Sequence, residues 1–157
     1  MNTDFIIKAL DLELFIPLMS LDDRALAAAG AKWVCVDSKP GFPCRVSLVE
    51  AQVGERVMLV NFVHLDTSSP YRSSGPIFVR EQATTINLSV NEIPEVLHSR
   101  LLSLRGYSSS HDMIEAVTAQ GGQLKLAMHN MFANPDVGYV QIHNANPGCF
   151  SCAAYRA

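Results

Sequence analysis

In the stretch RVMLVNFVHL, residues 56–65, apolar side chains occupy odd and even positions alike, and β-branched and aromatic residues are frequent. Successive side chains of a β-strand point to opposite faces of a sheet, so this pattern is typical of a strand that is covered on both faces. We therefore predict that residues 56–65 form a central strand, with the other strands of the chain arranged around it.

Shorter segments with strand character lie on both sides of this central strand. Before it, KWVCVDS (32–38) and CRVSLVEA (44–51) are separated by the turn-forming SKPGFP. After it, DTSSPYRSSGP (66–76) is a loop rich in Ser, Pro and Gly, and IFVREQ (77–82) is a further strand. These assignments follow from the alternation of apolar residues and from the flanking turn residues. More strands are predicted toward the C-terminus, one ending near Tyr107 and three at 112–120, 137–144 and 149–156.

Two segments have the patterns of helices. Ser20 to Asp23 is a Ser-x-x-Asp sequence, which is typical of a helix N-terminus, and the Ala-rich residues after it end at Gly30. In residues 123–135, apolar side chains recur at i, i+3, i+4 and i+7, at Leu124, Ala127, Met128 and Met131. Many short strands without strict βαβ alternation predict an α+β fold, a single domain over residues 1–157 with an antiparallel or mixed β-sheet and two main helices.

Composition narrows the classes of function. A chain of 157 residues with 48% apolar content can bury one core, and its net charge of −3 without any basic run disfavours a nucleic-acid partner. No apolar run approaches the roughly 20 residues that span a bilayer, and the first residues lack the pattern of a signal peptide. The sequence therefore predicts a soluble, cytoplasmic protein without a membrane partner. Its four cysteines are expected to be reduced thiols or metal ligands.

The strongest chemical signal is HNANPGCFSC, residues 143–152. If NANPG is a five-residue hairpin loop, the flanking strands pair His143 with Cys149, Gln141 with Ser151 and Tyr139 with Ala153. Cross-strand neighbours lie roughly 5 Å apart at Cβ, close enough for an imidazole to stabilise a thiolate. This register predicts a catalytic dyad of Cys149 as nucleophile and His143 as base.

The same cysteines allow an alternative, a zinc site. Its ligands would be Cys44, His143, Cys149 and Cys152. Two cysteines three residues apart chelate zinc from a tight turn, but on an extended strand they point to opposite faces. We therefore favour no cofactor, and we interpret Cys152 as a buried core thiol, with zinc as the alternative.

Arginine, histidine and tyrosine side chains supply candidates for ligand binding. Arginine suits bidentate contact with a carboxylate or phosphate, although an arginine in an apolar strand can also pair with a glutamate as an internal brace. Tyr71 and Arg72 lie in the loop 66–76, which could present both to a cleft. The predicted partner is a small anionic molecule, and the candidate ligand-binding residues are Arg45, His64, Tyr71, Arg72, Arg105 and Tyr107.

Five blocks of the sequence resemble a family of small bacterial proteins known only as domain of unknown function 1203. The blocks are PCRVSL (43–48), GERVMLVNFVH (54–64), SPYRSSGPIFVRE (69–81), LRGY (104–107) and HNANPGCFSCAAYR (143–156). Together they extend over nearly the whole chain. The resemblance implies a single-domain bacterial protein, and it assigns no activity, cofactor or catalytic residue.

Three classes of function are consistent with these residues. The first is an enzyme that acts on a small anion, with Cys149 and His143 as its catalytic pair and an arginine that orients the substrate. The second is a binding module in which the arginines and Tyr71 hold an anion without chemistry. The third is a structural or interaction domain stabilised by zinc. No motif in the sequence fixes a reaction type.

Overall fold

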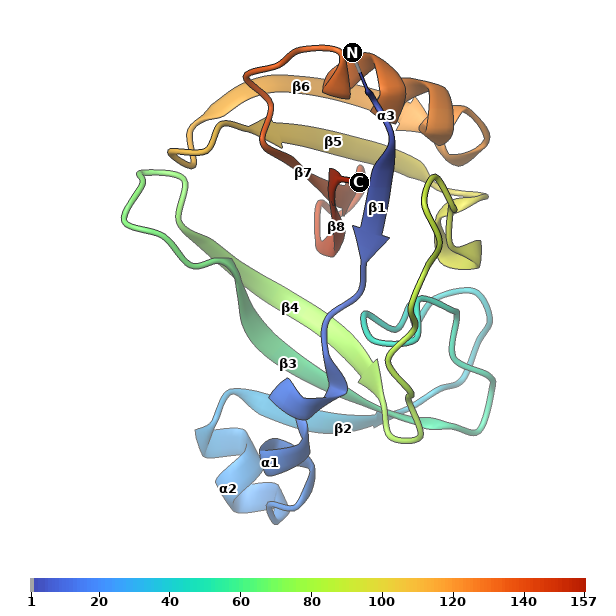
Figure 1. Cartoon of the computed structure of the whole chain (residues 1–157). Helices are drawn as coiled ribbons and strands as arrows, with labels where there is room; N and C mark the ends of the chain where they lie inside the picture. The colour runs from blue at the N-terminus through green and yellow to red at the C-terminus, as the bar shows by residue number, and fades with distance from the viewer. Residues whose placement is uncertain (1) are drawn as a thin grey trace.

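Two antiparallel sheets make up the framework of the chain in the computed structural model, which describes residues 2–157 (Figure 1). One sheet has five strands in the order β1-β8-β7-β5-β6, and the other has three in the order β2-β3-β4. The strands are β1 (Phe5–Lys8), β2 (Ala31–Cys35), β3 (Arg56–Leu65), β4 (Ser73–Arg80), β5 (Leu101–Tyr107), β6 (Met113–Gln120), β7 (Tyr139–Asn144) and β8 (Phe150–Arg156). The α+β class is confirmed, with strands predominating over helices.

Strand β3 occupies residues 56–65 as predicted and lies between β2 and β4. Val57 packs in a small cluster on one face, while Met58 and Val60 belong to a larger cluster on the other face. The prediction of a central strand is therefore confirmed, but its two faces are covered unequally, because Leu59 and Val63 on the face of Val57 are only partly buried and Asn61 is exposed. The prediction of one sheet is wrong, because β5, β6, β7 and β8 do not pair with β3 but form a second sheet with β1.

The helices are shorter than predicted. In residues 2–157 the α-helices are α1 (Ile16–Met19), α2 (Asp23–Ala28) and α3 (Leu124–Phe132). The single-turn 3-10 helices are η1 (Leu12–Leu14) before α1, η2 (Glu95–Leu97) between β4 and β5, and η3 (Gly121–Gln123) before α3. The expectation of two main helices is not confirmed, because α2 has only six residues. Its N-cap is Asp22, whose carboxylate accepts from Ala25 N at 2.8 Å, whereas the Ser20 hydroxyl donates to Pro17 O at the end of α1. No helix in this part of the chain is long and apolar enough to cross a membrane.

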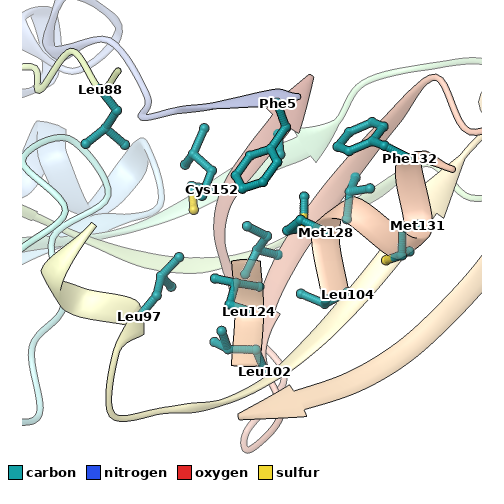
Figure 2. Packing of buried hydrophobic residues seen from close by; sticks show 14 of the residues in the cluster. Phe5, Leu88, Leu97, Leu102, Leu104, Leu124, Met128, Met131, Phe132 and Cys152 are labelled. Atoms are coloured by element: carbon teal, nitrogen blue, oxygen red, sulfur yellow. The ribbon is translucent and has the colours of Figure 1, made fainter. Parts of the chain in front are cut away.

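Helix α3 covers one face of the five-stranded sheet (Figure 1). The buried side chains of its predicted apolar face, Leu124, Met128 and Met131, pack in one cluster with Leu104 of β5 and Phe5 of β1 (Figure 2). This is the main core of the protein. A second cluster lies on the three-stranded sheet and includes Phe15 and Leu26 from the N-terminal helical segment.

Residues 44–51 do not form the predicted strand. Only isolated bridges occur there, between Cys44 and Phe78 and between Pro43 and Glu50. The segment runs between the two cores, with Val46 buried in the cluster of the three-stranded sheet and Leu48 in that of the five-stranded sheet. Its alternating apolar residues are therefore buried, but against two different layers and without regular pairing. This path places Arg45 at the junction of the two sheets.

Candidate functional site

Arg45 is the largest fully buried side chain of the described residues, with only 2% of its surface exposed. Its guanidinium donates from Nε to Phe150 O at 2.8 Å, from Nη1 to Pro43 O, and from Nη2 to Cys149 Sγ at 3.2 Å. No carboxylate in residues 2–157 forms an ion pair with it. Burial lowers the pKa of Arg45, and the neighbouring Cys149 opposes that shift. Arg45 is thus a buried cation without a carboxylate counterion.

The Cys149 thiol lies in the loop between β7 and β8, at intermediate exposure. Its sulfur accepts from two donors, Arg45 Nη2 and Asn144 Nδ2, the latter at 3.3 Å. The backbone holds this loop closed, because Asn144 N donates to Cys149 O at 2.9 Å. A cation beside a cysteine stabilises the thiolate, which is the nucleophilic form.

Asn144 ends β7 beside the thiol and is 4% exposed. Its amide nitrogen contacts Cys149, but its Oδ1 atom has no hydrogen-bond partner. It is the only buried side-chain nitrogen or oxygen in the described part of the chain without a partner. A buried carbonyl oxygen without a donor costs free energy, so this atom is a candidate acceptor for a bound group.

A cavity of about 230 Å³ brings these polar groups together. Arg45, Asn144 and Cys149 line it, together with a second guanidinium, that of Arg100. Arg100 forms an ion pair with Glu50 and donates from Nε to Val96 O at 3.1 Å. The apolar part of the lining includes Pro43, Pro76, Phe78 and Pro147. Three blocks of the sequence, around residues 43–45, 76–78 and 144–149, therefore meet at one cavity.

The predicted pairing of His143 with Cys149 is wrong. Strands β7 and β8 pair Tyr139 with Tyr155, Gln141 with Ala153, Ile142 with Cys152, and His143 with Phe150. The strands end at Asn144 and Phe150, so the loop starts one residue later than NANPG. An irregularity between the Ile142 and His143 pairs then brings Phe150 to the face of His143. This irregularity was not predicted from the local sequence pattern.

The ring of His143 contacts the backbone of the loop that carries Cys149, and it does not contact the Cys149 thiol. Its Nδ1 lies 3.0 Å from Gly148 O, and its Nε2 lies 3.1 Å from Gln141 Oε1. Burial lowers the pKa of His143 to about 3, so the ring is neutral at pH 7 and donates from only one of these nitrogens. His143 therefore positions the loop that carries Cys149, and its role as a base stays an untested prediction.

His64 belongs to the same hydrogen-bonded group. Its Nδ1 contacts Gln141 Oε1 at 2.9 Å, and Gln141 Nε2 donates to His64 O at 2.7 Å. The His64 ring stacks on Phe150 at a centroid distance of 5.2 Å. Burial lowers the pKa of His64 as well. Gln141 thus links one histidine from each sheet.

Four of the other predicted ligand-binding residues lie outside the cavity. Tyr71 and Tyr107 meet with ring centroids 6.2 Å apart, and Tyr107 stacks on Tyr139 at 5.3 Å. Arg105 Nε lies 3.4 Å from Ser103 Oγ, and Arg72 pairs with Asp66 at the surface, where its side chain is 56% exposed. Of the six predicted ligand-binding residues, the structure places only Arg45 in the cavity. Contact of the others with a ligand stays a prediction.

The four residues of the zinc alternative do not converge. Cys44 Sγ accepts from Ser47 N and Arg80 N, while Cys152 lies in the main core among Phe5 and Leu124 (Figure 2). Burial raises the pKa of Cys152 to about 12, as expected for a core thiol. No group of three or more His, Cys, Asp or Glu side chains within residues 2–157 is arranged to hold a metal ion.

Sequence reasoning missed Arg100 and Asn144 as residues of the site. Asn144 lies inside the HNANPG stretch, where an asparagine is an ordinary turn residue. Arg100 precedes β5 and reaches the cavity only through the tertiary arrangement.

Comparisons with known proteins give one match. A family described as "Protein of unknown function (DUF1203)" matches residues 41–156, which contain every polar residue of the cavity. No curated protein and no solved structure matches the chain.

Proposed function

The chain belongs to the DUF1203 family, and we propose that it binds a small anionic molecule in the cavity lined by Arg45, Arg100, Asn144 and Cys149. The observation that carries this proposal is the buried guanidinium of Arg45 without a carboxylate partner. A buried charge is costly unless it is paired, and an anionic ligand would supply the missing partner. A bacterial origin, which the family resemblance implies, and a cytoplasmic location, which was predicted from the sequence, are part of this proposal.

The charges around the cavity favour an anion. Glu50 neutralises Arg100, whereas Arg45 contributes a positive charge that carbonyl oxygens and a thiol only solvate. A guanidinium is also the side chain best suited to hold a carboxylate or an oxyanion in a fixed orientation. The volume of about 230 Å³ is below the roughly 300–1,000 Å³ of typical ligand pockets, which favours a small ligand. Asn144 Oδ1 would accept a hydrogen bond from an O–H or N–H group of the same ligand.

Anion binding is measured as ligand-induced stabilisation. We would record thermal unfolding in formate, acetate, sulfate and phosphate, each against chloride at equal ionic strength. A ligand at a hundred times its Kd stabilises the folded state by about 2.7 kcal/mol. We expect at least one anion to stabilise the wild type and not Arg45→Met.

The matched control is Arg72→Met, which removes an arginine that lies at the surface and pairs with Asp66. It should keep the full stabilisation. The side-chain amide signal of Asn144 in the wild type gives a second readout by NMR, independent of whether Arg45→Met folds. Equal stabilisation of Arg45→Met and wild type, or no anion that stabilises or shifts the Asn144 signal, would contradict the proposal.

A further inference from the structure

The sulfur of Cys149 is surrounded by donors. Arg45 Nη2 and Asn144 Nδ2 both donate to Sγ, at 3.2 and 3.3 Å. A neutral thiol can accept only weakly, whereas a thiolate is a strong acceptor and gains most from a neighbouring guanidinium. The contacts place two donors at the sulfur atom that would react.

Within residues 2–157, no histidine, aspartate or glutamate side chain forms a hydrogen bond with this sulfur. Both nitrogens of His143 are directed at Gly148 O and Gln141 Oε1, and burial keeps that ring neutral. The reactions that suit such a site are those in which a thiolate attacks directly. Reduction of a peroxide is one of them, because the thiolate itself supplies the electron pair.

The unpartnered Oδ1 of Asn144 gives an independent indication. This oxygen is buried in a residue that is 4% exposed, and the residue lines the cavity beside Cys149. It requires a donor, which neither a thiolate nor the surrounding side chains provide. A cysteine sulfenic acid carries an S–O–H group, whose hydroxyl can donate to Asn144 Oδ1 while its oxygen accepts from Arg45.

We propose that Cys149 is a site of oxidation by small hydroperoxides. The thiolate attacks the terminal peroxide oxygen, so that an S–O bond forms and the O–O bond breaks. Sulfur loses two electrons, the peroxide gains them, and hydroxide or an alkoxide leaves and takes a proton from water. The product is the sulfenic acid, held by Arg45 and Asn144.

The other three cysteines serve as internal controls. Cys44 and Cys152 are buried, whereas Cys35 is exposed and forms no hydrogen bond through its sulfur within residues 2–157. If exposure alone governed oxidation, Cys35 would react first. If the donors around the sulfur govern it, Cys149 reacts first despite its lower exposure.

The experiment treats the full-length reduced protein with hydrogen peroxide in the presence of dimedone, which traps sulfenic acids. Peptide mass spectrometry then follows labelling at Cys149 and Cys35 over time. We expect Cys149 to be labelled at least tenfold faster than Cys35 in the folded protein. In urea the two cysteines should react at similar rates, because unfolding removes the donors.

A faster reaction at Cys35, or a Cys149 rate that is the same in the folded protein and in urea, would overturn the proposal. Asn144→Leu gives a second test, because it removes the amide while keeping the size of the side chain. It should slow labelling of Cys149 at least threefold and leave Cys35 unchanged, and an unchanged Cys149 rate in the folded variant would contradict the role of Asn144.

The proposal of Cys149 oxidation and the proposal of anion binding can be tested separately. The anion titration can be repeated with Cys149→Ser, in which this site cannot be oxidised. Anion stabilisation of this variant without any fast oxidation of wild-type Cys149 would leave the proposed function and remove the present inference. Fast oxidation of Cys149 in the wild type, without anion stabilisation of either protein, would support the oxidation proposal and contradict the proposed anion binding.

Discussion

Toward α3, strands β5 and β7 present apolar side chains such as Leu104 and Ile142, whereas on their opposite face they present Arg105, Gln141 and His143. The two faces alternate along the same residues, and each cross-strand pair belongs to one face or the other. Side chains on the apolar face pack together through complementary shape alone, without hydrogen bonds. The polar face must satisfy each group with a hydrogen bond, as Gln141 and His143 do, and His143 also contacts the loop that carries Cys149. One face thus stabilises the sheet, and the other positions that loop.

The largest effect is expected on the apolar face. Met128→Ala removes a fully buried side chain from the main core, and such a truncation costs about 2–5 kcal/mol. Urea unfolding should show this loss, while anion stabilisation of the folded variant stays at the wild-type level. Leu126→Ala on the same helix, where the side chain is 60% exposed, should change stability by less than about 0.5 kcal/mol. A Met128 variant that is stable, or folded but unable to bind, would break the separation of the two faces.

An intermediate effect is expected when the pH is lowered, because acid destabilises the folded state through His143 on the polar face. Burial lowers the pKa of His143 to about 3 from its ordinary value of 6.5, so the unfolded chain binds a proton that the folded chain does not bind between these values. The contribution of His143 to the free energy of unfolding is therefore fully present above about pH 6.5, and it decreases as the pH drops below this value. At about 1.4 kcal/mol for each pKa unit, His143 alone lowers the free energy of unfolding by about 2 kcal/mol between pH 7.5 and 5.

Urea unfolding at these two pH values checks the prediction. His143→Gln should lose less stability than the wild type over the same interval, because the glutamine does not titrate. The imidazole signals of His143 in the folded protein should not move between pH 7.5 and 5. A titration of His143 near pH 6.5 would show that the polar face tolerates a charge at this position.

The smallest effect is expected outside both faces. Arg72 and Asp66 form an exposed pair with Nη2 and Oδ1 3.3 Å apart, and such pairs contribute about 0–1 kcal/mol. Arg72→Met should therefore shift the urea midpoint only slightly, and less in 0.5 M salt than at low salt. A large loss of stability, or of anion binding, would show that the loop containing Tyr71 belongs to the functional site.

Local patterns predicted much of the fold. Strand β3 was identified because it is a long apolar run rich in β-branched residues, and helix α3 because its apolar residues recur at helical spacing. Strand β6 was identified because a Gly pair ends it at residues 121 and 122. Residues 44–51 were assigned wrongly because alternation indicates a strand with one buried face, whereas here Val46 and Leu48 pack in two different cores. The cap at Asp22 was missed because Ser20 fits the same motif.

The candidate site was predicted in part, and the reason lies in chain topology. Arg45 and Cys149 were both named from their chemistry, but their contact joins residues 104 positions apart and has no local signal. His143 was placed on the wrong partner because an irregularity in β7 and β8 shifts the register. The Oδ1 atom of Asn144 can be recognised as unpartnered only in the three-dimensional structure, because its surroundings come from distant parts of the sequence.

The long-range contacts of Arg45 have a consequence for biosynthesis. The cavity requires residues near position 45, strand β4 and the hairpin of β7 and β8, so it cannot form before that hairpin has been synthesised. Contacts of such large sequence separation close late in folding. Any ligand that needs this cavity therefore recognises only chains in which residues 41–150 have folded together, and its binding would report that this folding has finished.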